Sequence, residues 1–116
     1  MSVDWDSLRT ELAMMARRRD LRINIWSKEM PSEWNPTQVL NPETDMPFTD
    51  SSAWDLIADL LEANHPFCEV KLRQPPGQIG YEATIALRHD LPTLYIKIQK
   101  KSGKIIGRSF HNSLRC

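Results

Sequence analysis

Two stretches of the chain carry apolar residues at the spacing of an amphipathic α-helix. In the first, from Asp4 to Arg19, the apolar stripe is Trp5, Leu8, Leu12 and Met15. The second stripe is Trp54, Ile57, Ala58 and Leu61, and it follows a helix-capping run, Thr49-Asp50-Ser51-Ser52. Asn64-His65-Pro66 ends this helix, with His65 as a C-terminal cap, because proline disfavours helical backbone in the residue before it.

Apolar and polar residues alternate in five other stretches, which is the pattern of half-buried β-strands. The stretches are 21–26, 67–73, 81–87, 94–99 and 105–111. A glycine turn joins the last two, and the connections before them are short, which favours antiparallel pairing. The predicted fold is α+β, with two helices packed on one face of an antiparallel sheet of about four to five strands that ends in a C-terminal β-hairpin.

At 116 residues, the chain is long enough for one domain with its own core. It divides into an N-terminal helix and strand (1–26), a proline-rich loop (27–48), and a helix with the antiparallel sheet (49–116). The prolines that interrupt the loop are Pro31, Pro36, Pro42 and Pro47. We expect Trp26 and Trp34 to anchor it to the protein surface. The loop could be a lid, a partner-binding arm or a segment wrapped along the core.

The net charge is zero, but the charges are unevenly distributed. Residues 1–65 contain six Lys/Arg and twelve Asp/Glu, whereas residues 66–116 contain nine Lys/Arg and three Asp/Glu. A basic half suggests a surface that faces a polyanion. Alternatively, the two halves pack together and neutralise each other. The arginines at 17–19 also allow two interpretations, contact with phosphate or a favourable end to the first helix.

No apolar run approaches the roughly 18 residues of a membrane span, and the N-terminus lacks a signal-peptide pattern. A cytoplasmic protein with reduced Cys68 and Cys116 is expected. Cys68 alternates with core residues and is interpreted as a small buried hydrophobe. His65 and Cys68 have a spacing that could suit a metal, but no second pair completes a site, so we expect no metal site.

The register of the hairpin decides which of its side chains share a face. A three-residue loop (Lys101 to Gly103) would pair Lys97 with Gly107 and leave Arg108 on the side of the helices. A two-residue loop (Ser102-Gly103) would pair Lys97 with Arg108, and a bulge at Gly107 would re-aim Arg108. In the first register, the residues facing the helices would be Leu94, Ile96, Ile98, Ile106 and Phe110. The sequence leaves these registers open.

The hairpin concentrates side chains that suit metal-free cleavage of RNA. Such cleavage needs a base for the 2′-hydroxyl proton, an acid for the leaving 5′-oxygen, and cations that stabilise charge on the phosphate. His111 suits proton transfer near neutral pH. Arg108 and Lys97 would hold the phosphate, and Ser109 or Tyr95 would donate a hydrogen bond. The expected nucleic-acid contacts are Lys71, Arg73, Tyr81, Gln99, Lys100, Lys101 and Lys104, with Tyr81 stacking on a base.

From residue 51 to 113, the order of elements and the sequences LYIKIQ and KIIGRSFH resemble the C-terminal half of the RelE/MqsR-like bacterial toxin ribonucleases. The resemblance implies an mRNA-cleaving toxin of a toxin–antitoxin pair, without a cofactor. It also implies a cognate antitoxin that covers the basic face. The matching site positions are Tyr95, Lys97, Gln99, Arg108 and His111.

The neutral charge and the acidic N-terminal half also fit a non-enzymatic interaction protein. Such a protein could be an immunity protein, an antitoxin-like inhibitor or a phage-encoded binder whose acidic helices bind a basic partner. Exposed aromatic residues such as Trp34 would then carry the affinity. A third interpretation is an RNA-binding module without cleavage activity, whose affinity would fall with added salt.

Overall fold

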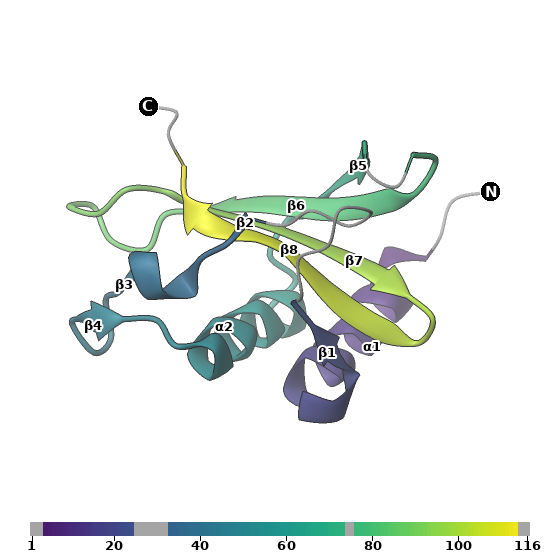
Figure 1. The fold of residues 1–116 in the computed structure, drawn as a ribbon, viewed down its shortest axis with the longest axis horizontal. Coiled ribbons are helices and arrows are strands. Elements are labelled where there is room, and N and C mark those ends of the chain that lie inside the picture. Colours follow the sequence, from purple (N-terminus) through teal and green to yellow (C-terminus); the bar gives the residue numbers. More distant parts are fainter. Residues whose placement is uncertain (1–3, 25–32, 74–75, 114–116) are drawn as a thin grey trace.

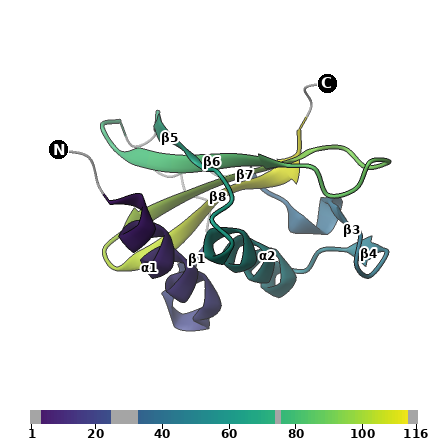
Figure 2. The same cartoon turned by 180° about the vertical axis from the view of Figure 1, so that it is seen from behind.

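The computed structural model describes residues 4–24, 33–73 and 76–113. Two helices lie on one face of a mostly antiparallel sheet, which confirms the predicted α+β class (Figures 1 and 2). The helices are α1 (Trp5–Arg17) and α2 (Asp50–Glu62), with short 3-10 helices η1 (Arg19–Leu21) and η2 (Pro36–Gln38). The strands are β1 (Arg22–Ile23), β2 (Glu33–Trp34), β3 (Leu40–Asn41), β4 (Met46–Pro47), β5 (Cys68–Lys71), β6 (Ile79–Ile85), β7 (Leu94–Lys101) and β8 (Lys104–Asn112).

The main sheet has the strand order β1-β8-β7-β6-β5, and β2 also pairs with β8. Strands β5 to β8 form an antiparallel meander, whereas β1 and β2 run parallel to β8. β1 lies beside Ile105 and Ile106, and β2 lies beside Ser109 and Phe110. The two short strands therefore cover the edge of β8 that β7 leaves open, which protects this edge from pairing with other chains.

The segment 27–48, predicted to be a loop, is more ordered than expected where the structure describes it. It contains β2, η2 and a two-stranded ladder of β3 and β4. Trp34 is an anchor as predicted, because the centroid of its ring lies 4.8 Å from that of Trp54 and 5.5 Å from that of Phe110. Its indole Nε1–H also donates a 2.8 Å hydrogen bond to Asp50. Trp26, the other predicted anchor, lies outside the described residues.

Both helices begin at side chains that the sequence indicated. Asp4 caps α1 by accepting a 3.1 Å hydrogen bond from the backbone N–H two residues on. Thr49 and Ser52 form a reciprocal capping box at the start of α2. After α2, Asn64 adopts a left-handed φ of 57°, and the His65 N–H donates a 2.9 Å hydrogen bond back to a carbonyl of the last turn.

The hydrophobic core lies between the helices and the sheet. Both predicted helix stripes are buried there, apart from Trp5, which is half-buried. The sheet contributes Ala83, Ile85, Leu94, Ile96, Ile98, Ile105 and Phe110. Most of these residues lie directly across from one another in the strand register, so the sheet presents one continuous apolar face to the helices.

Cys68, interpreted as a small buried hydrophobe, is exposed. The alternation along β5 is as predicted, but the strand pairing places Cys68 across from Glu82. Its neighbour Glu69 pairs with Tyr81, whose ring faces α1 with its centroid 5.4 Å from that of Trp5. Successive residues of a strand point to opposite sides, so Cys68 faces away from the helices and the core. Cys116, the other cysteine that we expect to be reduced, lies outside the described residues.

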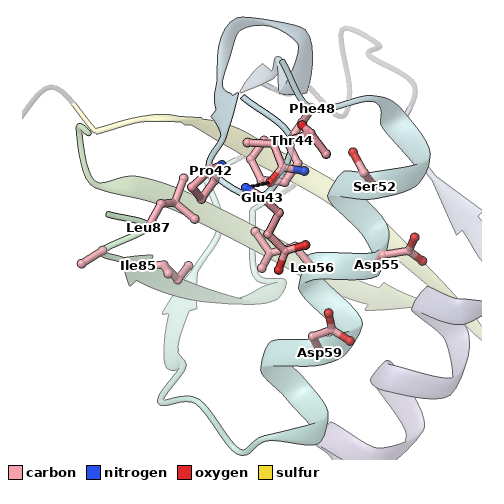
Figure 3. Close-up of a pocket in the computed structure, with 12 residues that line it drawn as sticks. Pro42, Glu43, Thr44, Phe48, Ser52, Asp55, Leu56, Asp59, Ile85 and Leu87 are labelled. Carbon is pink, nitrogen blue, oxygen red and sulfur yellow. Dashed lines mark hydrogen bonds between the residues drawn. The ribbon is translucent and has the colours of Figure 1, made fainter. Parts of the chain in front are cut away.

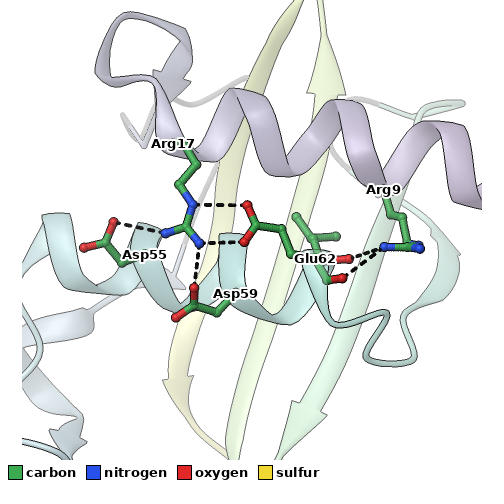
Figure 4. Close-up of polar contacts among 6 residues, drawn as sticks. Arg9, Arg17, Asp55, Asp59 and Glu62 are labelled. Carbon is green, nitrogen blue, oxygen red and sulfur yellow. Dashed lines mark hydrogen bonds and ion pairs between the residues drawn. The ribbon is translucent and has the colours of Figure 1, made fainter.

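Arg17, from the arginine triplet, joins α1 to α2 (Figure 4). Its guanidinium lies 2.6 Å from Asp59, 2.8 Å from Glu62 and 3.7 Å from Asp55. The Arg17 hydrogen bond holds the pKa of the Glu62 carboxyl below its usual range. Two turns earlier, Arg9 donates to two carbonyl oxygens at the C-terminus of α2 over 2.9 and 3.3 Å. Arg17 therefore binds carboxylates that connect the helices, rather than standing ready for phosphate.

Gly107 has no room for a side chain. A Cβ atom there would lie 2.5 Å from Cζ3 and 2.6 Å from Cε3 of Trp34. We expect Gly107→Ala to lower the free energy of unfolding by about 1–3 kcal/mol, because the indole must move out of a packed site. Urea denaturation measures this. In a Trp34→Leu background the same change should cost clearly less, and equal costs in both backgrounds would contradict the explanation.

The contribution of Arg17 to stability should depend on pH. The native pKa of Glu62 is depressed, so the unfolded chain binds the proton more readily than the native protein does. The stabilisation is then complete above the ordinary glutamate pKa, and it is lost as the pH falls through the native value. We expect the stability difference between the wild type and Arg17→Met to shrink below about pH 4. Arg18→Met is the control, since Arg18 pairs only with Asp20 among the described residues, and a pH-independent Arg17 effect would refute this account.

Candidate active site on the outer face of the sheet

The hairpin of β7 and β8 turns at Ser102-Gly103, with positive φ angles of 54° and 75°. Lys97 pairs with Ser109, but the residue after Lys97 pairs with Gly107. Arg108 is therefore the extra residue of a β-bulge. The structure combines the two-residue loop with a bulge directly after Gly107, and the register with a three-residue loop is wrong.

The outer face is the side of the sheet that is turned away from α1 and α2. Through the bulge, it carries the polar set predicted from the hairpin, which is Tyr95, Lys97, Gln99, Ser109 and His111. Arg108 joins this set instead of facing the helices, and its Nη1–H donates a 3.3 Å hydrogen bond to Gln99 Oε1. Ile106, expected on the side of the helices, pairs with Gln99 on the outer face, and Ile105 enters the core in its place. A one-residue change of register explains the exchange.

Near the end of the hairpin, five side chains form what we call the outer-face cluster: Glu33, Glu82, Tyr95, Lys97 and His111. The Tyr95 hydroxyl donates a hydrogen bond to Glu82 Oε2. On its other side, the Tyr95 ring centroid lies 5.3 Å from that of His111. His111 Nε2 in turn lies 3.3 Å from Glu33 Oε2. The cluster therefore links β6, β7, β8 and β2 across the outer face.

The outer-face cluster provides groups that can accept and donate protons. His111 Nδ1 lies 2.9 Å from the Asn112 carbonyl oxygen, so the hydrogen bond between them requires a hydrogen on Nδ1. Nε2 is then the nitrogen that can exchange a proton. Glu82 supplies a carboxylate, and Lys97 lies directly across from it with a positive charge. Groups of the kinds that acid–base chemistry uses, an imidazole, a carboxylate and an ammonium, are thus gathered on neighbouring strands.

Three of the predicted site residues are buried, although they lie on the outer face. Gln99 is 2% exposed, and Arg108 and Ser109 are each 5% exposed. Burial lowers the pKa of the Arg108 guanidinium. In this conformation a substrate would contact the half-buried Tyr95 and Lys97 first. The buried Arg108 guanidinium could contribute its charge but would have little direct contact with the substrate.

The predicted nucleic-acid contacts do not form one surface. Tyr81 packs against Trp5 on the side of the helices, and Lys100 Nζ is held 2.7 Å from Glu11 on that same side. The remaining basic residues are exposed at the end of the sheet where the β5–β6 and β7–β8 turns lie (Figure 1). They are Lys71, Arg73, Lys101 and Lys104. This basic end of the sheet lies at the opposite end of β7 and β8 from Tyr95 and His111, so basic residues do not surround the outer-face cluster.

Sequence reasoning missed both carboxylates of the outer-face cluster. Glu82 alternates with core residues and looked like an ordinary surface position until the pairing of β6 with β7 placed it across from Lys97. Glu33 lies in the segment predicted as a loop, and only the parallel pairing of β2 with β8 brings it beside His111. The strand alternation around Glu82 could have predicted its side of the sheet, whereas no local pattern in the sequence indicates where Glu33 lies.

Ion pairs connect the acidic N-terminal half to the basic C-terminal half in the described part of the chain. They are Lys100–Glu11 at 2.7 Å, Arg88–Asp45 at 3.4 Å and His111–Glu33 at 3.3 Å. The two halves therefore neutralise each other in part, which was the alternative to an open polyanion-facing surface.

A separate groove of about 430 Å³ lies between α2, the turn that joins β3 to β4, and the end of β6 (Figure 3). Leu56, Ile85 and Leu87 give it an apolar wall. Its carboxylates are Glu43, Asp55 and Asp59, and its described lining contains no basic side chain. Asp55 and Asp59 are already paired with Arg17, which leaves Glu43 as the lining carboxylate without an ion pair among the described residues. With no basic side chain in its described lining, the groove offers phosphate no partner.

Among the described residues, no group of three or more histidine, cysteine or carboxylate side chains is placed to hold a metal ion. None of the helices in the described ranges is long and apolar enough to cross a membrane. No protein-family model matches the chain, and no curated protein or solved structure matches it. Only the geometry of the described residues therefore bears on the function of this protein.

Arg108 and Lys97 should differ in what they contribute to stability. Arg108→Ala removes a buried side chain and its hydrogen bond to Gln99, so we expect a loss of about 1–3 kcal/mol in the free energy of unfolding. Lys97 is half-buried and makes no hydrogen bond or ion pair with the described residues, so Lys97→Ala should change stability by less than about 1 kcal/mol. Chemical denaturation of both variants tests this, and equal losses would show that Arg108 is not built into the sheet.

Proposed function

We propose that this protein is a metal-independent endoribonuclease and the toxin component of a toxin–antitoxin pair that cleaves mRNA in the cytoplasm. The observation that supports the proposal is the outer-face cluster, in which Glu82, Tyr95 and His111 follow one another across three strands beside Lys97. The resemblance of residues 51–113 to RelE/MqsR-like toxins points to the same reaction. A cognate antitoxin would then cover the outer face and the basic end of the sheet.

In the proposed reaction, the 2′-oxygen of the substrate attacks the neighbouring phosphorus while Glu82 accepts the 2′-hydroxyl proton. The bond from phosphorus to the 5′-oxygen breaks, and His111 Nε2 donates a proton to that oxygen. The products are a 2′,3′-cyclic phosphate and a free 5′-hydroxyl. Lys97 stabilises the charge that develops on the phosphate. The Tyr95 hydroxyl donates a hydrogen bond to Glu82 in the free protein and would turn to the phosphate once Glu82 is protonated.

The basic end of the sheet would hold the rest of the RNA. Its residues, Lys71, Arg73, Lys101 and Lys104, are exposed, and the RNA would run along the sheet from this end to the cluster at the other end of β7 and β8. Lysine and arginine at such positions bind phosphates without reading sequence, and they give binding a strong salt dependence. Arg108 and Ser109 would fix the position of β8 beneath the substrate, because both are buried.

The non-enzymatic alternative is favoured by one observation, the acidic groove beside α2. Its carboxylates Glu43, Asp55 and Asp59 and its apolar wall suit a basic segment of a protein partner. An inhibitor or immunity protein would use this groove and leave RNA intact. The two functions therefore predict different sensitive residues on opposite sides of the sheet.

The ribonuclease proposal is tested with purified protein and a single-stranded RNA in the presence of EDTA. We expect cleavage that leaves 2′,3′-cyclic phosphate ends. His111→Ala and Glu82→Gln should each lower the rate about 10²–10⁴-fold, the usual contribution of one acid–base group. The matched controls are His89→Ala and Glu43→Gln, which change exposed residues outside the cluster and should keep wild-type rates.

Induced expression in bacteria gives the same test in cells, with growth and bulk mRNA followed together. Growth arrest with loss of mRNA, both relieved by His111→Ala, would support the toxin. Arg108→Ala is unsuitable here because the side chain is buried and its loss destabilises the fold. Intact RNA in vitro and normal growth, with folded wild-type protein, would refute the proposal.

A further inference from the structure

A small pocket lies on the helix side of the sheet, beside the edge strand β5. Its volume is about 180 Å³, and its lining residues are Trp5, Leu8, Phe67, Glu69 and Tyr81. We call it the aromatic pocket. Glu69 lies on β5 and Phe67 directly precedes this strand. Tyr81 lies across from Glu69 on β6, and Trp5 belongs to the first turn of α1. The pocket belongs to neither the outer-face cluster nor the acidic groove.

Three rings form the wall of the aromatic pocket. The Trp5 ring centroid lies 6.0 Å from that of Phe67 and 5.4 Å from that of Tyr81, with interplanar angles of 40° and 39°. Rings tilted at these angles do not stack flat on one another, and all three line the pocket. His65 packs edge-on against Phe67, with ring centroids 6.2 Å apart, and supports its orientation. All three rings are only half-buried, so a ligand can reach them.

One carboxylate contributes negative potential to the pocket. Glu69 is exposed, and its side chain makes no hydrogen bond or ion pair with the described residues. Two cations lie in this region. The Lys100 Nζ is held 2.7 Å from Glu11, and the exposed Lys71 follows two residues after Glu69 on the same face of β5. Burial and the Glu69 charge raise the pKa of Tyr81, which agrees with a carboxylate close to that ring. Aromatic faces add to this potential, because the quadrupole of a ring is negative over its face.

We propose that the aromatic pocket binds a quaternary or methylated ammonium group. Such a cation is attracted to aromatic faces within about 6 Å and needs little hydrogen bonding, so rings with one carboxylate are sufficient partners. The pocket is smaller than the roughly 300 Å³ at which pockets for whole drug-sized ligands begin, so it accommodates a headgroup rather than an entire ligand. An anion would meet Glu69, and an unmethylated ammonium would lose hydration that the rings cannot replace. The site is independent of the proposed ribonuclease activity.

The binding is measured by NMR titration of the full chain, with the indole N–H signal of Trp5 assigned from a Trp5→Phe spectrum. The probes are choline, a peptide with one trimethyllysine, and the uncharged isostere of choline in which carbon replaces nitrogen. We expect saturable shifts with choline and the peptide, and at least about tenfold weaker binding of the isostere. Tighter binding of choline would identify a small-molecule source of the cation, and tighter binding of the peptide a modified protein side chain.

Two substitutions separate charge from ring contacts. Glu69→Gln keeps the shape and removes the charge, so affinity for choline should fall about fivefold. Tyr81→Leu should weaken it by a further two- to fivefold, roughly the cation–π contribution of one exposed ring. Asp20→Asn, which changes an exposed carboxylate outside the aromatic pocket and the acidic groove, is the control and should bind like the wild type. Equal affinity for choline and its isostere, an unchanged affinity in Glu69→Gln, or no saturable shift of the wild type would each overturn the proposal.

Discussion

The pairing of β8 on both of its edges is the interaction on which the remaining structure depends. β7 pairs with one edge, and β1 and β2 pair with the other in parallel, so residues from both ends of the chain meet on one strand. The six residues from Ile105 to Phe110 are all buried. Gly107 makes this arrangement possible, because only a missing side chain lets Trp34 pack over the strand and reach Trp54 and Phe110.

The bulge at Arg108 decides where the chemistry lies. Without it, the residues of β8 after Gly107 would alternate in the opposite phase, and His111 would point toward the helices. With it, His111 lies beside Tyr95, and Arg108 and Ser109 lie on the outer face. One extra residue in β8 therefore allows the apolar residues of this strand to face the helices while His111 lies on the outer face. Bulges that re-aim side chains are common next to active sites.

Local patterns predicted the helices well, because a helix stripe and its caps are encoded within a few consecutive residues. Thr49 and Ser52, for example, signal the start of α2 without reference to the remaining chain. The strands of the meander were recognised too, whereas β2, β3 and β4 fell in the predicted loop. The register of the hairpin stayed open, because Gly107 indicated a possible bulge but nothing local decided whether it forms. For the same reason Glu33 escaped notice, whereas Tyr95, Lys97 and His111 were found. Cys68 was misplaced because β5 is an edge strand whose outer side reaches solvent.

The neutral charge of the chain acquires a physical meaning in this fold. On the outer face, two of the proton-donating groups have a carboxylate close by, in the contacts of His111 with Glu33 and of Tyr95 with Glu82. Such pairing weakens a general attraction for nucleic acid, which depends on uncompensated positive charge. The same pairing does not prevent proton transfer within the outer-face cluster, because proton transfer requires an acid and a base side by side. A ribonuclease built this way would depend on its basic end, or on a partner, to bring RNA to the cluster. Its selectivity would then come from delivery of the substrate rather than from electrostatic capture.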